Sequence, residues 1–512
     1  MKVNQIKVGV LLSYTQMAIQ IMVGLIYTPI MLKLLGQSEY GLYNTVASTI
    51  STLGILSLGF GSSYIRYYAK YKKNNEVSQI YKLNGLFIIV FGIIGFIAAL
   101  CGGFLTFHLE LVFDKGLTSA ELEIARVLMV LLTFNLAASF PMSVFGTIIG
   151  AHEKFIFQKA LGMIQTVLSP CLTLPMLMLG FGSIGLVSVS VGLSIVTWIY
   201  QIYYCFAKLK ERFIFKNLDV SVFKGALIYS GFIAINMIVD QINWNIDKIL
   251  LGRYKGTVAV AIYSIGFSLY TYYQTFSTSV SNVFTPRIHT IVNNTEKDMK
   301  IQKKLLTELF VKVGRIQFLI LGCIASGMCF FGKDFITCLW AGKGYEDSYA
   351  VALLLILPSS IALIQNTGIE IQRALNKHQF RSIVYLGMAI INLGLSIVLC
   401  QKYGAIGSAI GTAVSLLVVN GIIMNIFYHQ ACNIDIIKFW KSIGKISKGL
   451  IVPCILGVII KCYGKYINFT VFALEIVLYC VIYALSMWKF GMNEYEKNLT
   501  KGAILKLVKK GK

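Results

Sequence analysis

The sequence predicts an all-α, polytopic membrane protein in which about fourteen transmembrane helices form two pseudo-symmetric six-helix lobes, plus two C-terminal helices, around a central cavity. Of its 512 residues, 56% are hydrophobic and only 13% are charged, whereas soluble domains carry about 25% charged residues. The apolar residues form runs of about 20, separated by short basic or glycine-containing breaks. These runs are typical of helices that cross a bilayer, and they exclude a soluble globular protein.

The spans follow one another with short connections. The first apolar run, Val8 to Leu32, is too long for a signal-peptide core and lacks a small-residue cleavage site, so we expect it to remain as the first span. The predicted spans cover residues 8–34, 41–65, 83–107, 123–149, 160–180, 184–206, 223–250, 258–286, 313–331, 349–372, 382–400, 405–429, 449–467 and 470–488.

The charges are distributed unevenly. Net charge is +24, but alternating spans with a cytoplasmic N-terminus place about three quarters of the 46 Lys and Arg residues on the inner side. The basic excess therefore indicates topology and contact with anionic lipids, not nucleic-acid binding. Both termini are expected on the cytoplasmic side of a cell membrane. The 11 Cys residues are scattered without a CxxC pair, so no metal site is predicted.

Several short motifs recur at one offset of about 220 residues, which indicates an internal repeat. LGMI at 161–164 matches LGMA at 386–389, FGSIG at 181–185 matches YGAIG at 403–407, and Pro141 matches Pro358. An even number of spans per unit makes this a parallel repeat, related by an axis along the membrane normal. We therefore predict three regions: a first lobe at 1–206, a second at 207–430, and two extra helices with a basic cytoplasmic tail at 431–512.

Polar residues line one face of four predicted spans. In the seventh span they recur at steps of four and three, which places them on one helical face. Because an ionised Asp facing lipid costs about 2.5–3.5 kcal/mol, such faces should meet each other or water. The first and second spans, equivalent to the seventh and eighth in the repeat, are also polar on one face. The predicted cavity residues are Gln16, Gln20, Asn44, Ser48, Asn236, Asp240, Asn243, Tyr270, Tyr273, Gln274 and Asn282.

Three segments give the chain a family resemblance. LLGQSEYGLYNTVAS after the first span, DKILLGRYKGTVAVAIYS after the seventh and YGAIGSAIGTAVS opening the twelfth resemble the oligosaccharide (Wzx-type) flippases of the polysaccharide biosynthesis export family. These belong to a superfamily with lipid II flippases and multidrug antiporters. The resemblance implies translocation of an undecaprenyl-diphosphate-linked oligosaccharide to the outer leaflet of a bacterial cell membrane by alternating access, for cell-surface polysaccharide assembly. It also implies a cavity lined by the first, second, seventh and eighth spans, and other glycan-assembly membrane proteins as partners.

Cationic residues in this chain depart from the pattern of better-studied relatives, which carry several cations deep in the cavity. Here the arginines lie near the inner ends of spans, where guanidinium groups could contact a diphosphate or lipid headgroup at the cavity entrance. The candidates are Arg66, Arg287, Arg315 and Arg373. The alternative for Arg66 and Arg287 is a routine boundary anchor.

Three acids are candidates for ion coupling. Intramembrane acids are functional by default, so Asp240 could exchange a proton or hold Na⁺; its alternative is a structural hydrogen bond. Asp247, beside Lys248, could form an interfacial ion pair instead, and Glu370 could pair with Arg373 three residues along the helix. Tyr270 and Tyr273 could contact sugar faces or simply pack between helices. Apart from a coupling H⁺ or Na⁺, no cofactor is predicted.

Two other functions remain open. A multidrug or organic-cation antiporter would use the acidic cavity directly. A membrane-embedded glycosyltransferase or glycan polymerase would need a sizeable loop with catalytic acids, and the loops here are short. We therefore predict a transporter, not an enzyme.

Overall fold

The computed structural model describes residues 5–57, 59–113, 116–295, 298–463 and 469–510. Within these residues all regular structure is helical, as predicted. By backbone contacts the chain divides into two compact units. Unit 1 comprises residues 1–264 and 389–411, and unit 2 comprises residues 265–388 and 412–512. The lobes predicted at 1–206 and 207–430 follow the sequence repeat instead of the packing, so their boundaries stay a prediction.

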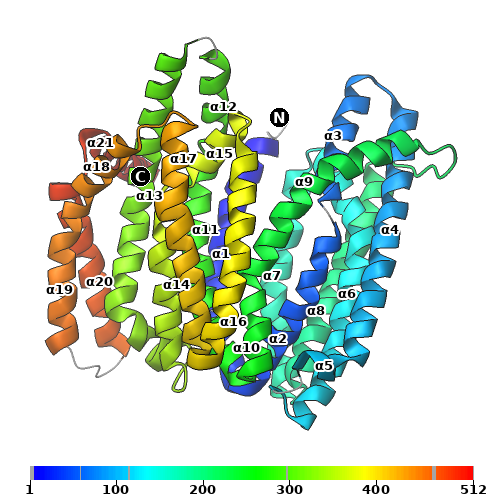
Figure 1. The fold of residues 1–512 in the computed structure, drawn as a ribbon, viewed down its shortest axis with the longest axis horizontal. Coiled ribbons are helices and arrows are strands. Elements are labelled where there is room, and N and C mark those ends of the chain that lie inside the picture. Colours follow the sequence, from blue (N-terminus) through cyan, green and yellow to red (C-terminus); the bar gives the residue numbers. More distant parts are fainter. Residues whose placement is uncertain (1–4, 58, 114–115, 296–297, 464–468, 511–512) are drawn as a thin grey trace. The chain divides into compact units, whose positions relative to one another are not determined.

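In the described residues of its first part, unit 1 contains ten α-helices and two short helical segments, shown in blue to green in Figure 1. They are α1 (Gln5–Leu35), α2 (Gln37–Thr52), η1 (Leu53–Ser57), α3 (Phe60–Lys73), α4 (Val77–Phe107), α5 (Leu109–Phe113), α6 (Ser119–Ala151), α7 (Phe155–Met178), α8 (Gly182–Tyr203), η2 (Tyr204–Lys208), α9 (Val220–Trp244) and α10 (Ile246–Tyr254). Two helices run from one unit into the other, α11 (Thr257–Asn282) and α16 (His378–Leu416).

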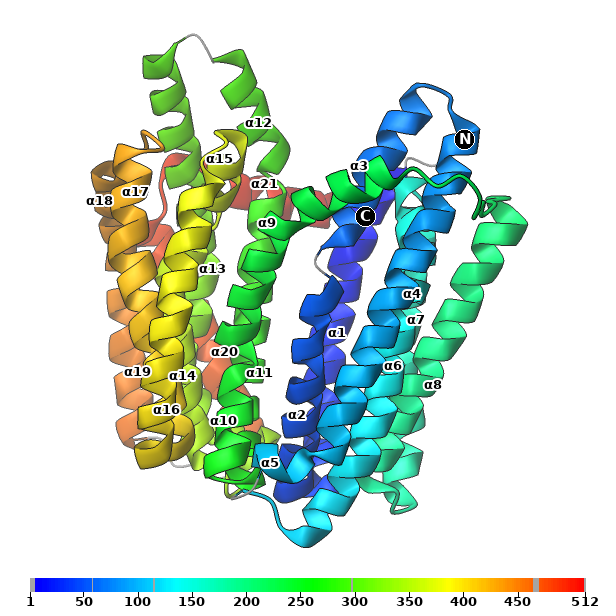
Figure 2. The ribbon, with the colours of Figure 1, turned by 45° about the vertical axis from the view of Figure 1, so that its right-hand side comes forward.

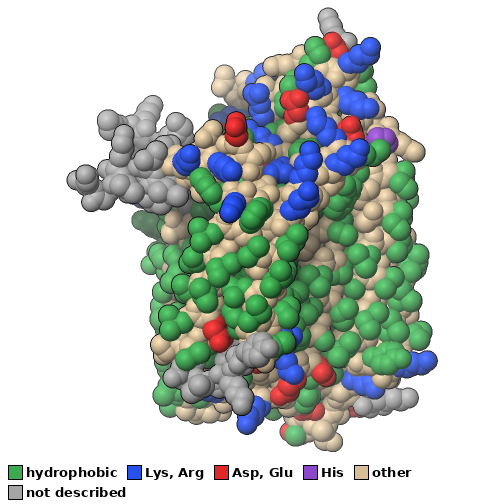
Figure 3. Space-filling model, turned by 90° about the vertical axis from the view of Figure 1, so that its left-hand side faces the viewer, with side chains coloured by type: hydrophobic (Ala, Val, Ile, Leu, Met, Phe, Trp, Pro, Cys, Tyr) green, Lys and Arg blue, Asp and Glu red, His purple; other side chains and the backbone are tan. Residues whose placement is uncertain are grey.

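Unit 2 contains the remaining helices. They are α12 (Thr285–Asn294), α13 (Met299–Asp334), η3 (Phe335–Trp340), α14 (Glu346–Ile364), α15 (Thr367–Ala374), η4 (Leu417–Ile423), α17 (Met424–Gln430), α18 (Ile436–Ser447), η5 (Lys448–Leu450), α19 (Ile451–Tyr463), α20 (Phe469–Ser486), η6 (Met487–Gly491) and α21 (Glu494–Lys510). On the face of the molecule in Figure 3, hydrophobic side chains form a broad band and Lys and Arg gather mainly above it. This pattern is that of a membrane-embedded surface with a basic margin.

Eleven described helical segments are long and apolar enough to cross a membrane. One of them, Gln379–Gln430, has 52 residues, far more than the roughly 20 that a bilayer requires, and Gly404 interrupts its helical geometry with φ 58°. That break falls between the predicted spans 382–400 and 405–429. The eleven do not include α9 or α11, which correspond to the predicted spans 223–250 and 258–286, so the count of fourteen stays a prediction.

Local chemistry sets several helix boundaries in unit 1. A capping box starts α6, because Thr118 Oγ1 accepts from the Glu121 backbone N–H and Glu121 accepts from the Thr118 N–H. Asp219 caps α9 by accepting from the Ser221 backbone N–H at 2.9 Å. Hydrogen bonds from the Ser221 side chain and backbone hold the pKa of the Asp219 carboxyl below its usual value.

The tightest packing in unit 1 joins α4 and α6, which lie side by side in Figures 1 and 2. Gly95 and Gly102 on α4 face Ala137 and Thr133 on α6 so closely that an added Cβ would collide. Small residues allow such close approach where helices pack in lipid. An aromatic core that includes Tyr64, Tyr68 and Phe87 completes this region, and it supports the end of the unit where α3, α6 and α8 finish.

Candidate functional site

A large cavity lies within unit 1, between α3, α6, α7 and α8; apolar atoms form the larger part of its wall, and we call it the polar cavity for the hydroxyl, amide and charged groups that also line it. Its volume is 1310 Å³, which exceeds the 300–1,000 Å³ typical of small-molecule sites. It lies near His152, at the end of the unit where α6 finishes and α7 begins; we call this the His152 end. The lining residues are Gly61, Ser62, Ile65, Tyr68, Ala69, Lys72, Lys73, Ser139, Ser143, Gly146, Thr147, Gly150, Ala151, Glu153, Phe155, Gln158, Trp198 and Gln201.

Two glycines on α6 make room for two amides in the cavity wall. The Gln158 side chain donates to the Gly146 carbonyl at 2.6 Å, and a Cβ at Gly150 would lie 3.5 Å from the same amide. A Cβ at Gly146 would lie 3.5 Å from the amide of Gln201 on α8. The glycines thus let amide groups from α7 and α8 line the cavity, where they can both donate and accept hydrogen bonds.

Hydroxyl groups recur along α6 at steps of four residues. Ser139, Ser143 and Thr147 each donate to a carbonyl of their own helix, at 2.6, 2.6 and 2.9 Å. Because each hydroxyl oxygen also has acceptor lone pairs, this side of the cavity can accept hydrogen bonds from a ligand.

Cations and aromatic rings complete the lining. Lys72 and Lys73 are exposed residues at the last turn of α3, and the Lys72 ammonium lies 5.5 Å from the ring centroid of Tyr68. Trp198 lines the cavity from α8, and Glu153 is the one acid among the lining residues. Aromatic faces with hydroxyls and amides suit sugars, and lysines suit phosphate. The cavity therefore fits a ligand that carries both sugar units and a phosphate group.

A buried hydrogen-bond network supports the cavity wall from behind. Glu211, 7% exposed, follows η2; its Oε1 lies 2.7 Å from His152 Nε2 and its Oε2 accepts from the Asn84 amide at 2.8 Å. The Tyr64 hydroxyl donates to Asn84 Oδ1 at 2.6 Å, and the Tyr68 hydroxyl lies 3.0 Å from His152 Nε2. The network therefore ties the loop after α8 to Tyr68, a residue of the cavity wall.

Replacing Asn84 with Leu should destabilise the protein by about 1–3 kcal/mol, because buried oxygens of Glu211 and Tyr64 lose their partner. The lower stability should appear as a lower midpoint of thermal unfolding of the purified protein in detergent. Asn74→Leu, at an exposed amide bonded to Glu76, is the matched control and should change the midpoint little. Equal effects of the two substitutions would contradict the buried network.

The opposite end of unit 1 is closed by a cluster of hydrogen bonds around Glu121, which we call the Glu121 clasp. Ser38 and Thr257 hydroxyls both donate to Glu121 Oε1, at 2.5 and 2.8 Å, and lie 2.8 Å from each other. The clasp joins α2 and α6 to the start of α11, all within unit 1. Nearby, Glu39 accepts from the Ser183 backbone and hydroxyl at 2.7 and 2.8 Å.

Close backbone contacts accompany the clasp. A Cβ at Gly41 would collide with the Thr257 carbonyl, and one at Gly116 would collide with the Gly252 carbonyl. Only glycine permits such an approach. The Glu121 end of unit 1 is therefore closely packed, while the polar cavity lies at the His152 end.

The structure places the predicted cavity residues of unit 1 in several environments. The Gln16 amide lies against Gly162 of α7, Asn44 donates to the Tyr40 carbonyl at 2.9 Å, and Ser48 is buried. Gln20 and Asp240 are exposed. Asn392 on α16 lies 3.4 Å from Asn243, and the side chain of Asn236 lies outside the described part. None of these residues lines the polar cavity.

In unit 2, the two predicted tyrosines pack between helices. Tyr270 and Tyr273 are 3% and 1% exposed, and the Tyr273 hydroxyl lies 2.7 Å from that of Ser360 on α14. Gln274 is half-buried and Asn282 is exposed. In this structure Tyr273 packs between helices, which was one of the two alternatives for it. A contact with a sugar stays a prediction.

The candidate coupling acids Asp247 and Glu370 are both held by neighbours. Asp247 is fully buried and accepts from the Tyr263 hydroxyl at 2.9 Å. Glu370 forms an ion pair with Arg373 at 2.6 Å, the local helical alternative. Among the described residues no group of His, Cys, Asp and Glu could hold a metal ion.

One predicted headgroup contact needs correction. Arg315 is 5% exposed, and its five N–H donors are used within the protein. Nε and Nη2 donate to Glu496 at 2.5 and 2.8 Å, Nη1 donates to the carbonyl and hydroxyl of Ser442, and Nη2 donates to the Gly491 carbonyl. Contact with a lipid headgroup is incompatible with this arrangement. Arg66, Arg287 and Arg373 are exposed, and their headgroup role stays a prediction.

Known proteins share this architecture. The structure is similar to a lipid II flippase, MurJ, in an inward closed conformation, with a TM-score of 0.72 at 16% identity, covering 94% of this chain and 97% of that one. It is also similar to an inward-facing multidrug resistance MATE family transporter of the MOP superfamily, with a TM-score of 0.54, 14% identity, and 81% and 99% coverage. A third similar structure is a MOP superfamily transporter from Pyrococcus furiosus. Its TM-score is 0.53 at 14% identity, covering 83% of this chain and 95% of that one.

The chain thus has the fold that these flippase and transporter structures share. A comparison with curated protein sequences gave no significant match. Residues 7–292 match the polysaccharide biosynthesis protein family, and the chain belongs to that family.

Proposed function

We propose that this protein is a flippase that moves a polyprenyl-diphosphate-linked oligosaccharide from the cytoplasmic to the outer leaflet, for cell-surface polysaccharide assembly. The observation that carries the proposal is the polar cavity of unit 1. Its hydroxyls, amides and rings suit an oligosaccharide, and Lys72 and Lys73 suit the diphosphate. Membership of the polysaccharide biosynthesis family supports the same substrate class.

The two ends of unit 1 support an alternating-access mechanism. The Glu121 end is closely packed through hydrogen bonds and glycine contacts, and the His152 end holds the cavity. The basic residues near the His152 end, including Lys72, Lys73 and Lys154, favour a cytoplasmic orientation for that end. The substrate headgroup would then enter from the cytoplasm, and opening of the Glu121 clasp would release it on the other side.

We propose that Asp240 couples transport to H⁺ or Na⁺, since a carboxylate within an apolar helix is costly unless it has a function. Asp240→Asn should reduce ion-dependent transport at least about tenfold, the scale of a lost coupling free energy of 1–3 kcal/mol, with an unchanged midpoint of thermal unfolding. Transport in proteoliposomes with and without an imposed ion gradient measures the effect. Full gradient-dependent activity in the variant would exclude Asp240 as the coupling residue.

The proposed function is tested by depletion of the protein in its native cell. Lipid-linked oligosaccharide should accumulate in the inner leaflet, and mass spectrometry of extracted lipids would identify its glycan. A multidrug antiporter would instead leave these intermediates unchanged and raise sensitivity to organic cations. The cavity favours the first outcome because Glu153 is the one acid among its lining residues.

A further inference from the structure

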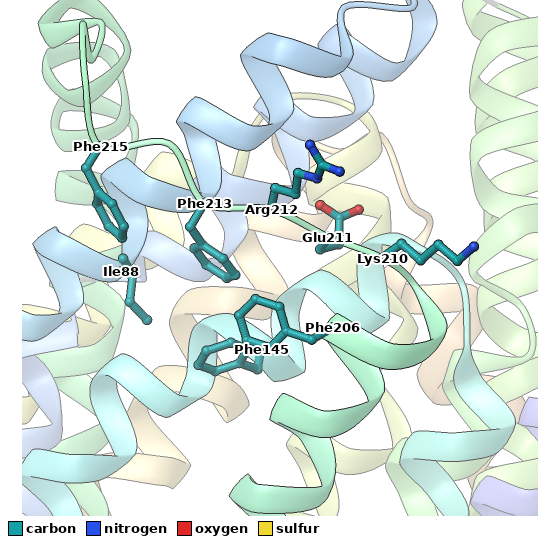
Figure 4. A pocket seen from close by; sticks show the side chains of 8 residues that line it. All are labelled: Ile88, Phe145, Phe206, Lys210, Glu211, Arg212, Phe213 and Phe215. Carbon is teal, nitrogen blue, oxygen red and sulfur yellow. The ribbon is translucent and has the colours of Figure 1, made fainter.

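A second pocket lies on unit 1, beside the segment that connects η2 to α9. Its volume is 810 Å³. Ile88 on α4, Phe145 on α6 and Phe206 on η2 line it together with residues 210–213 and 215. Figure 4 shows Phe145, Phe206 and Phe213 gathered together, with Phe215 and Ile88 to one side.

The connecting segment has no regular helix from Lys210 to Phe215. Lys210 and Arg212 are exposed, whereas Glu211 between them is buried. Lys210 adopts a left-handed backbone conformation, with φ 56°, so the chain turns at this residue and leaves Lys210 and Arg212 exposed on either side of the buried Glu211. Glu211 therefore points into the unit, toward His152 and Asn84, and the two cations stand on its surface.

The segment is fixed in place at both ends. The Glu211 N–H donates to the Cys205 carbonyl at 3.1 Å, and the Ile214 N–H donates to the Tyr81 carbonyl at 3.0 Å. Gly85 allows α4 to approach the Ile214 carbonyl so closely that a side chain there would collide. The pocket is thus a built feature of the fold, and the backbone that carries its two cations has a defined position.

The pocket has an apolar floor next to two cations. Ring centroids of Phe145, Phe206 and Phe213 lie 5.5 to 6.2 Å apart in all three pairs. Lys210 and Arg212 are two residues apart in the chain and both are exposed, so their long, flexible side chains can both turn toward one phosphate. The pocket lies where the candidate span Gly182–Lys208 ends, the level at which lipid headgroups meet acyl chains.

We propose that this pocket binds one anionic membrane phospholipid, with its phosphate between Lys210 and Arg212 and an acyl chain against Phe206 and Phe213. The charge of the two cations selects an anionic headgroup, and the aromatic floor selects a ligand with a hydrocarbon chain. The same segment carries Glu211, whose contacts with His152 and Asn84 support the wall of the polar cavity. A lipid bound to this segment therefore holds that support in place. The proposal concerns lipid binding and does not depend on the transported substrate.

The test uses the full-length protein in a neutral detergent, with native mass spectrometry and thermal unfolding as readouts. Phosphatidylglycerol should be retained as one bound lipid and should raise the midpoint of unfolding, and phosphatidylcholine with the same acyl chains should do neither. The double variant Lys210→Gln/Arg212→Gln should bind phosphatidylglycerol at least tenfold more weakly, with an unchanged midpoint in the absence of lipid. Lys208→Gln/Lys216→Gln, which removes two cations of the same region outside the pocket, should bind as the unaltered protein does.

Three outcomes would overturn the proposal. If both double variants bound phosphatidylglycerol equally weakly, the lipid would be attracted by basic charge in general and not by this pocket. An equal stabilisation by glycerol 3-phosphate would show an anion site without a lipid chain. Displacement of phosphatidylglycerol by polyprenyl diphosphate at a lower concentration would assign the pocket to the substrate path.

Discussion

Gly41→Ala should lower the transport rate by about 10- to 100-fold. The added Cβ would collide with the Thr257 carbonyl. The collision raises the free energy of the conformation in which the Glu121 end is closed. Overpacking costs about 1–3 kcal/mol, and each 1.4 kcal/mol shifts a two-state population about tenfold. An alternating-access transporter must visit the closed state in every cycle, so the loss should appear in the rate of translocation in proteoliposomes.

Gly103→Ala is the matched control for this substitution. Gly103 lies within α4, and a Cβ there would meet nothing within 4 Å. Both substitutions replace a helical glycine by alanine, a gain in helix propensity of about 1 kcal/mol each. The difference between the two variants therefore measures the collision alone. If Gly41→Ala transports as fast as Gly103→Ala, the Glu121 end does not need to close as this structure shows.

Arg315→Met should destabilise the protein by about 3–5 kcal/mol, because removal of one partner leaves the buried Glu496 carboxylate without its countercharge. The ion pair joins α13 to α21, and both side chains are nearly inaccessible, at 6% and 3%. The midpoint of thermal unfolding in detergent should fall by several degrees.

Arg373→Met offers a matched comparison at an exposed pair. Its partner is Glu370 at 2.6 Å, but the Arg373 side chain is 61% exposed. Exposed pairs contribute about 0–1 kcal/mol, so this variant should unfold close to the unaltered protein. If both variants lost the same amount of stability, burial would not be the reason that the Arg315–Glu496 ion pair stabilises the protein.

Much of the fold could be predicted from the sequence, because hydrophobic runs and glycine breaks are local signals. Gly404 interrupts α16 in the break between two predicted spans. Gly36, with φ 77°, separates α1 from α2 in the break between the predicted spans 8–34 and 41–65. The number of spans and the lobe boundaries depend on packing, which local patterns do not determine.

The candidate site was harder to predict, because its residues come from helices far apart in the sequence. The steps of four between Ser139, Ser143 and Thr147 were a usable signal on one span. Nothing local indicates that Gln158 and Gln201 line the same cavity. Arg315 was misassigned for the same reason: its partner Glu496 lies 181 residues further along the chain, so only the folded structure shows the ion pair.

The most direct test of the account is translocation of a fluorescent polyprenyl-diphosphate oligosaccharide in proteoliposomes by the unaltered protein and by Lys72→Gln/Lys73→Gln. The unaltered protein should move the lipid between leaflets. The double variant, which lacks both lysines of the polar cavity, should be at least about tenfold slower, since charge-assisted contacts to phosphate contribute about 1.5–3 kcal/mol each. Lys300→Gln/Lys303→Gln, two exposed residues of α13, should transport normally. No translocation by the unaltered protein, or equal rates in both double variants, would contradict a flippase that binds its diphosphate in this cavity.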